Sequence, residues 1–180
     1  RTASSPAITS IVTDLTDQVK DHAEQQGYVF PGPVSISFEA ADDLSTGRRS
    51  NLDATQCQFI EGSVLDADVV SHLVGDCDVV FHLAAAVGVQ YVMQFPLASL
   101  ETNIRGTENI LRACSAYQRR VLIASTSEVY GKNAKDALGE DDDRLLGSAR
   151  VSRWFYATAK SIDEAFALAY YQERALPVVV

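Results

Sequence analysis

The stretch Asp78-Val79-Val80-Phe81-His82-Leu83-Ala84-Ala85 decides the fold. It is an apolar run without alternation, which is typical of a parallel strand covered on both faces. A second run, Val121-Leu122-Ile123-Ala124, predicts another buried strand, and a last strand begins at Val178. Because segments with the apolar spacing of helices lie between these runs, the sequence predicts a doubly wound α/β sheet with ligands at the carboxyl ends of its strands.

Helices and one shorter strand are predicted around these runs. Residues 57–61 can form the strand, and residues 69–73 mark a short helix closed by Gly75. A long helix follows the first apolar run, and another is expected from about residue 152 to residue 174. The inner stripe of the long helix is Leu100, Ile104, Thr107, Ile110, Leu111 and Cys114.

The N-terminal segment follows a different pattern. Apolar residues at helical spacing predict a helix that ends at Gly27, and alternation over residues 34–39 predicts a half-buried strand. The acidic pair Asp42 and Asp43 lies at the end of that strand.

Composition excludes two classes of partner. The 180 residues suit one domain, and no apolar run approaches the roughly 18 residues that cross a bilayer, so no membrane is expected. A formal net charge of −9 opposes binding to polyphosphate, so neither DNA nor RNA is an expected partner.

The cysteines indicate the compartment. Cys57, Cys77 and Cys114 are odd in number and set among apolar residues, which favours buried thiols in a reducing environment. The first residues do not form a charged start followed by an apolar core, so the sequence predicts no secretion signal. We therefore expect a cytoplasmic protein.

Tyr156 and Lys160 are four residues apart on a predicted helix, so they project from one face. A lysine ammonium near a phenol lowers the tyrosine pKa and makes the phenolate a base for a sugar hydroxyl. Lysine also suits a ribose hydroxyl of a cofactor. A Tyr-x-x-x-Lys pair is also common on solvated helix faces, so an interpretation in which the pair has no catalytic role stays open.

A polar stretch, Ser125-Thr126-Ser127-Glu128-Val129-Tyr130-Gly131, follows the second apolar run. Thr126 is the candidate for orienting a reacting sugar and sharing its proton with Tyr156. Ser127 and Glu128 are candidates for substrate contacts or acid/base steps. The alternative is a capped turn between a strand and a helix, because serine and threonine favour helix starts.

Together these motifs resemble the extended short-chain dehydrogenases/reductases over roughly residues 42–180. The nearest likeness is to NAD-dependent nucleotide-sugar epimerases, dehydratases and decarboxylases, and Glu128 resembles the residue found in UDP-glucuronate decarboxylases. The matching motifs are Asp42 to Gly47, Gly62 to Asp66, His82 to Ala85, Asn103 with Gly106-Thr107, Ser125 to Gly131, and Tyr156 with Lys160.

The resemblance implies a Rossmann-like fold, a nucleotide-sugar substrate and an NAD site, with Tyr156 and Lys160 at the nicotinamide ribose. Asp42 would accept the adenosine ribose hydroxyls and favour NAD over NADP, because a 2'-phosphate would meet its charge. Asn103 would brace the central helix, and His82 is expected to pack within the sheet. No metal ligand is implied. The other implied cofactor contacts are Asp43, Ser63, Val64, Leu83, Ala84 and Ala85.

The sequence departs from the family pattern at two places. It holds no Gly-x-x-Gly-x-x-Gly turn for the pyrophosphate, and Ser63 stands where the family has aspartate. We therefore expect an incomplete fold that lacks its first strand and its substrate region. NAD binding is in doubt for the same reason, and weak or absent activity is expected.

A second resemblance covers residues 8–47, which are similar to the N-terminal domain of bacterial forkhead-associated-domain proteins. It suggests a fusion or chimera, with an atypical segment over residues 1–47 and a partial NAD-binding domain over residues 48–180. The alternatives to an enzyme are a noncatalytic chimeric chain and a protein-interaction module. A gap in the sheet would also favour a homo-oligomer or a strand-swapped assembly.

Overall fold

The computed structural model describes residues 39–44 and 58–180, and the chain divides into two compact units, residues 1–62 and 63–180. The helix predicted to end at Gly27 and most of the strand predicted over residues 34–39 lie outside the described residues. The predicted boundary between residues 47 and 48 falls there as well, so it stays a prediction.

The described part of the first unit is a pair of parallel strands, β1 (Glu39–Asp42) and β2 (Gln58–Glu61). Asp42 is opposite Glu61, and the Gly62 N–H donates to the Asp42 carbonyl at 3.1 Å. The strand predicted over residues 57–61 is confirmed as β2. Asp42 closes β1, as the sequence predicted for the end of the first strand.

The second unit contains a three-stranded parallel sheet in the order β3-β4-β5. Its strands are β3 (Val79–His82), β4 (Arg120–Ile123) and β5 (Val178–Val179). His82 is opposite Ile123, and the Ala124 N–H donates to the His82 carbonyl at 3.2 Å, so β3 and β4 end together. These strands confirm the predicted parallel α/β sheet.

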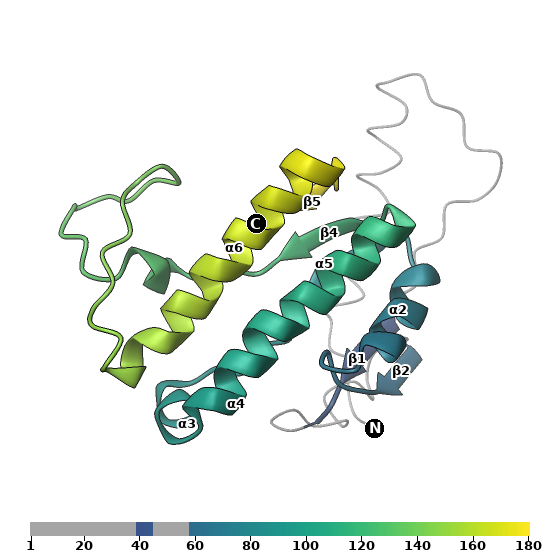
Figure 1. Ribbon diagram of the computed structural model, residues 1–180, viewed down its shortest axis with the longest axis horizontal. Helices are drawn as coiled ribbons and strands as arrows, with labels where there is room; N and C mark the ends of the chain where they lie inside the picture. The colour runs from purple at the N-terminus through teal and green to yellow at the C-terminus, as the bar shows by residue number, and fades with distance from the viewer. Residues whose placement is uncertain (1–38, 45–57) are drawn as a thin grey trace, which may run out of the picture. The chain divides into compact units, whose positions relative to one another are not determined.

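Helices α5 (Gly106–Tyr117) and α6 (Phe155–Arg174) pack against this sheet, and α2 (Ala67–Gly75) packs against α5. The Asp66 carboxylate begins α2 by accepting the N–H groups of Asp68 and Val69, both at 3.1 Å. Helix α5 ends at Gln118, which has a left-handed backbone with φ 52°. Figure 1 shows α5 and α6 side by side.

The single long helix predicted after β3 is a series of shorter ones. Pro96 begins a new helix because its ring fixes φ and supplies no N–H. The described segments are α3 (Val89–Gln94), α4 (Pro96–Leu100), the π-helical turn η2 (Glu101–Arg105) and then α5.

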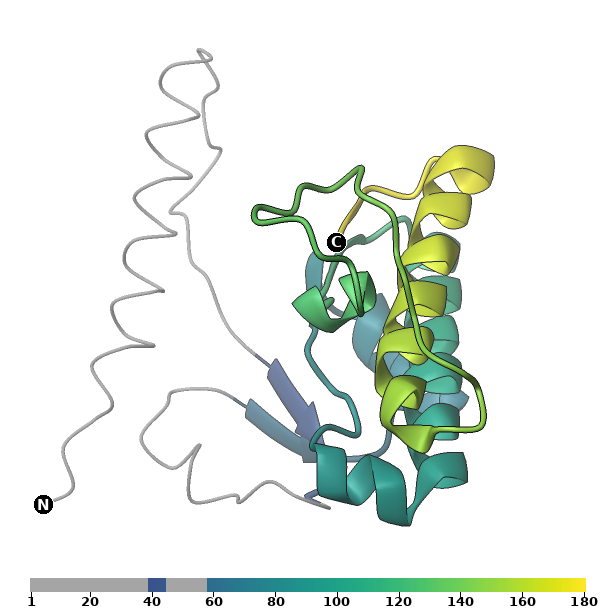
Figure 2. The ribbon, with the colours of Figure 1, turned by 90° about the vertical axis from the view of Figure 1, so that its left-hand side faces the viewer.

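The prediction that both faces of β3 are covered was wrong. Val79 and Phe81 are 46% and 51% exposed, whereas His82, on the other face, is 3% exposed. Both α5 and α6 contact the strands of this sheet, and Figure 2 shows the two helices together on one side of it. The apolar run therefore marked a strand of the sheet, but within residues 63–180 only one face of β3 is packed.

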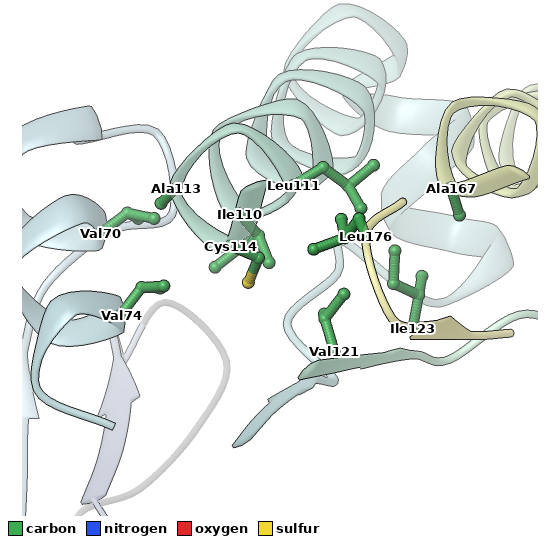
Figure 3. Close-up of a cluster of buried hydrophobic side chains, with 10 residues drawn as sticks. All are labelled: Val70, Val74, Ile110, Leu111, Ala113, Cys114, Val121, Ile123, Ala167 and Leu176. Carbon is green, nitrogen blue, oxygen red and sulfur yellow. The ribbon is translucent and has the colours of Figure 1, made fainter. Parts of the chain in front are cut away.

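The core of the second unit lies between β4, β5 and the three helices (Figure 3). Burial raises the pKa of the Cys114 thiol to about 12, which confirms the buried thiol predicted there. None of the helices in the described residues is both long and apolar enough to cross a membrane. The core residues are Val70, Val74, Ile110, Leu111, Ala113, Cys114, Val121, Ile123, Ala167 and Leu176.

Candidate active site

The polar stretch after β4 forms a capped turn. The Thr126 hydroxyl accepts the Glu128 N–H at 3.3 Å and begins the 3-10 turn η3 (Ser127–Tyr130). Gly131 then takes a φ of 58°, and a Cβ at this position would lie 2.6 Å from the Leu145 carbonyl oxygen. The capped-turn interpretation is therefore correct.

A cavity of about 290 Å³ lies next to this turn. Thr126 and Tyr156, predicted from separate motifs, both line it. Ser127 is exposed and Lys160 is buried, and neither is among the lining residues. The described residues that line the cavity are Val87, Gly88, Val89, Val92, Thr126, Glu128, Arg153 and Tyr156.

The cavity contains an ion pair that the sequence did not reveal. The Arg153 guanidinium donates to Glu128 Oε2 at 2.6 Å, and both side chains are a little over one-third exposed. Arg153 and Lys132 also lie against the Trp154 ring, at 5.7 and 5.5 Å from its centroid. An arginine with further donors beside a half-open cavity suits an anionic group on a ligand.

Tyr156 is half-buried, and its pKa is raised by burial and by the negative charges of Glu128 and Asp163. The sequence predicted the opposite direction, through Lys160. Burial is the largest cause of this difference. In addition, one turn further along α6 the Lys160 ammonium pairs with Asp163 Oδ2 at 3.2 Å. Both side chains of that pair are almost fully buried.

A second acidic residue of α6 connects the turn to the following loop. Glu164 accepts hydrogen bonds from the Ser125 hydroxyl and from the Arg144 guanidinium. The carboxylate thereby links the end of β4, the loop of residues 131–150 and α6. Nothing in the Tyr-x-x-x-Lys spacing predicts this link, although an acidic residue four positions after Lys160 is visible in the sequence.

Two further predictions concern buried polar residues. His82 packs within the sheet as predicted, and its Nε2 lies 3.0 Å from Thr107 Oγ1. Burial, with the Lys160 charge second, lowers the pKa of His82 to about 4. Asn103 braces the segment after β3, because its Oδ1 accepts the Ala86 N–H at 2.6 Å and its Nδ2 donates to the Ala86 carbonyl at 3.2 Å.

The residues predicted to contact NAD are distributed over both units. Asp42 Oδ1 accepts the Leu44 N–H at 2.6 Å, and Asp43, which follows it, is exposed. In the second unit, the Ser63 hydroxyl accepts the Leu65 N–H at 3.3 Å.

Other predicted contacts lie within the second unit alone. The Val64 carbonyl accepts from Asn109 Nδ2 at 2.9 Å. Leu83 is 67% exposed at the end of β3, and Ala84 and Ala85 after it are half-buried. Among the described residues, no group of three or more His, Cys, Asp or Glu side chains is arranged to hold a metal ion.

Comparison with known families gives two matches. Residues 31–180 match the family described as GDP-mannose 4,6 dehydratase, and residues 2–50 match the N-terminal domain of FhaA. The first match covers most of the chain, including every residue of the cavity.

Known proteins of this kind are similar to the chain over part of their length. A UDP-N-acetyl-alpha-D-glucosaminuronate decarboxylase from Bacillus cytotoxicus is 45% identical over 118 residues, which is 66% of this chain and 36% of that protein. DesIV, a dTDP-glucose 4,6-dehydratase from Streptomyces venezuelae solved with NAD and TYD bound, is 28% identical with a TM-score of 0.71, over 79% of this chain and 44% of that one.

A third similar protein is a UDP-N-acetylglucosamine 4-epimerase from Methanobrevibacter ruminantium, solved with UDP-N-acetylmuramic acid. It is 28% identical with a TM-score of 0.69, over 78% of this chain and 44% of that one. The chain thus spans less than half the length of these three proteins.

Proposed function

The chain belongs to the GDP-mannose 4,6-dehydratase family, within the extended short-chain dehydrogenases/reductases of nucleotide sugars, and from this premise we propose that its cavity holds the sugar of a nucleotide sugar during NAD-dependent oxidation. The observation that carries the proposal is that Thr126, Glu128, Arg153 and Tyr156 line one cavity. These four side chains supply a hydroxyl, a carboxylate, a guanidinium and a phenol.

Each side chain has a role in this proposal. The Thr126 hydroxyl orients the reacting sugar hydroxyl, and Tyr156 removes its proton. When NAD is bound, it supplies the acceptor for the hydride. Because the pKa of Tyr156 is raised in the ligand-free chain, its phenol is protonated near neutral pH, and forming the base requires positive charge to act on it.

Within the second unit, Ala84 and Ala85 are small enough for close approach of a cofactor. The resemblance to the family, rather than the geometry, assigns Asp42 of the first unit to the adenosine ribose. The sequence has no Gly-x-x-Gly-x-x-Gly turn for the pyrophosphate, so we expect this chain to bind NAD in the millimolar range at best.

NAD binding is tested by the melting temperature of the chain. A ligand that binds only the folded state at about ten times its Kd adds about 1.4 kcal/mol, or roughly 3–6 °C for a chain of this size. We expect NADP to give a smaller shift, because its 2'-phosphate meets Asp42. An Asp42→Asn variant should reduce the difference between the melting-temperature shifts that NAD and NADP give. No shift at about 10 mM NAD, which is ten times a millimolar Kd, would remove the cofactor from the proposal and favour a noncatalytic chain.

We further propose that the sugar carries a carboxylate, as in a UDP-glucuronate decarboxylase-like reaction. The support is Arg153, which lines the cavity and whose guanidinium has donors beyond the one that contacts Glu128. Oxidation of such a sugar two carbons from its carboxylate would allow carbon dioxide to leave, with Glu128 near the proton transfers.

The carboxylate assignment is tested with Arg153→Met. We expect it to weaken UDP-glucuronate binding about tenfold, equivalent to about 1.4 kcal/mol, and to change UDP-glucose binding little. Calorimetric titration of both sugars measures the difference. Arg112→Met, which removes an exposed arginine of α5, is the control and should affect neither sugar. Equal losses for both sugars would contradict the assignment.

A further inference from the structure

Lys160 does not present its charge to the cavity in this structure. Its ammonium lies 3.2 Å from Asp163 Oδ2, and the two side chains are 3% and 1% exposed. A lysine and an aspartate three positions apart lie on the same face of α6, one turn beyond Tyr156. An ion pair this deeply buried is strongly coupled, because little water screens it.

The pair belongs to a buried polar network built from three elements. Thr107 of α5 is fully buried and lies 3.0 Å from His82 of β3. Burial is the largest influence on Asp163 and raises its pKa to about 6. The charge of Lys160 and the hydroxyl of Thr107 act in the opposite direction, because both favour the ionised carboxylate. Glu164 is the other charged group that acts on Asp163, and it raises the same pKa.

Asp163 of this network contributes to the raised pKa of Tyr156, after burial and the charge of Glu128. Burial raises it first, and the charges of Glu128 and Asp163 raise it further. Asp163 therefore acts on the phenol with its own negative charge and also pairs with the Lys160 ammonium. A phenol four residues before Lys160 consequently receives little of the ammonium charge.

We propose that Asp163 is a positioning residue that holds the Lys160 ammonium within the buried network and limits how much of its charge reaches Tyr156. The inference rests on the proposed function only where it treats Tyr156 as the base. It assigns a role to an acidic residue that is not among the residues lining the cavity.

The test is the titration of Tyr156 in the ligand-free chain. Near-ultraviolet absorbance is followed against pH for each protein and for the same protein carrying Tyr156→Phe, so that the difference reports Tyr156. We expect Asp163→Asn to lower the Tyr156 midpoint by about one pH unit, because the unneutralised ammonium then favours phenolate. Adding Lys160→Met to Asp163→Asn should raise the midpoint again.

Equal midpoints in the single and double variants would overturn the inference, since Asp163 would then act without Lys160. If Asp163→Asn does not fold and the double variant does, the unpaired Lys160 charge is responsible, which supports the pairing. If neither folds, Asp163 serves helix packing and the inference is lost. Glu108→Gln, which breaks the exposed pair with Arg112, should leave the midpoint unchanged. The titration uses neither NAD nor sugar, so its outcome is separate from the test of the proposed function.

Discussion

Replacing Lys160 with methionine is expected to lower the free energy of unfolding by about 3–5 kcal/mol at about pH 8. The substitution leaves the Asp163 carboxylate buried without its counter-charge. At about pH 5 the carboxyl is protonated, because its pKa is already raised to about 6 in the native pair, and the loss should be smaller. Urea unfolding of both proteins at the two pH values measures the effect.

The double variant Lys160→Met/Asp163→Asn is the control for this prediction. It removes both charges, so we expect it to recover most of the stability that Lys160→Met loses. Arg112→Met breaks the exposed pair with Glu108 and should cost no more than about 1 kcal/mol. A Lys160→Met loss equal to that of Arg112→Met, or independent of pH, would show that the buried pair contributes nothing specific.

The sequence predicted the second unit of the fold well because its strands are marked by local patterns. The apolar run before Leu83 and the run from Val121 both became parallel strands, and the helix before Arg174 formed as expected. The errors were the coverage of β3 and the single long helix predicted after it. An apolar run reports that a strand suits burial, but the segments that cover each face come from distant parts of the chain.

The candidate site was predictable where one motif carries the residue. Thr126 and Tyr156 were identified from the turn and the helix, and they line the same cavity. Arg153 was not identified because its link to Glu128 joins positions 25 residues apart. No periodicity of a single helix or strand reports such a contact.

Lys160 shows why a correct motif can give the wrong electrostatics. The four-residue spacing puts Tyr156 and Lys160 on one face of α6, which is how the sequence predicted a lowered tyrosine pKa. The same spacing rule puts Asp163 beside Lys160, and burial makes that ion pair dominant. Whether the Lys160 charge acts mainly on Tyr156 or on Asp163 depends on how deeply this face of α6 is buried, and tertiary packing sets that burial.

The second large effect concerns His82, whose pKa falls from 6.5 to about 4 in the folded chain because of burial and, second, the charge of Lys160. Between these pH values the unfolded state binds more protons, so His82 makes stability fall as the pH drops from 6.5 towards 4. The full interval corresponds to about 3 kcal/mol. Asp163, with its raised pKa, acts in the opposite direction over part of this range, which hides the effect in the unmodified chain.

A His82→Gln variant separates the two contributions, because glutamine keeps a hydrogen-bonding atom near Thr107 and does not titrate. Relative to the unmodified chain, we expect the variant to gain up to about 3 kcal/mol in the free energy of unfolding between about pH 7 and about pH 4, whatever its packing costs at neutral pH. Urea unfolding across that range measures the difference. His72, whose side chain is 78% exposed on α2, provides the matched control, and His72→Gln should show no comparable change. If the difference between His82→Gln and the unmodified chain stays constant with pH, His82 is not held neutral by its surroundings, and the buried network lacks the electrostatic character on which the Lys160 argument depends.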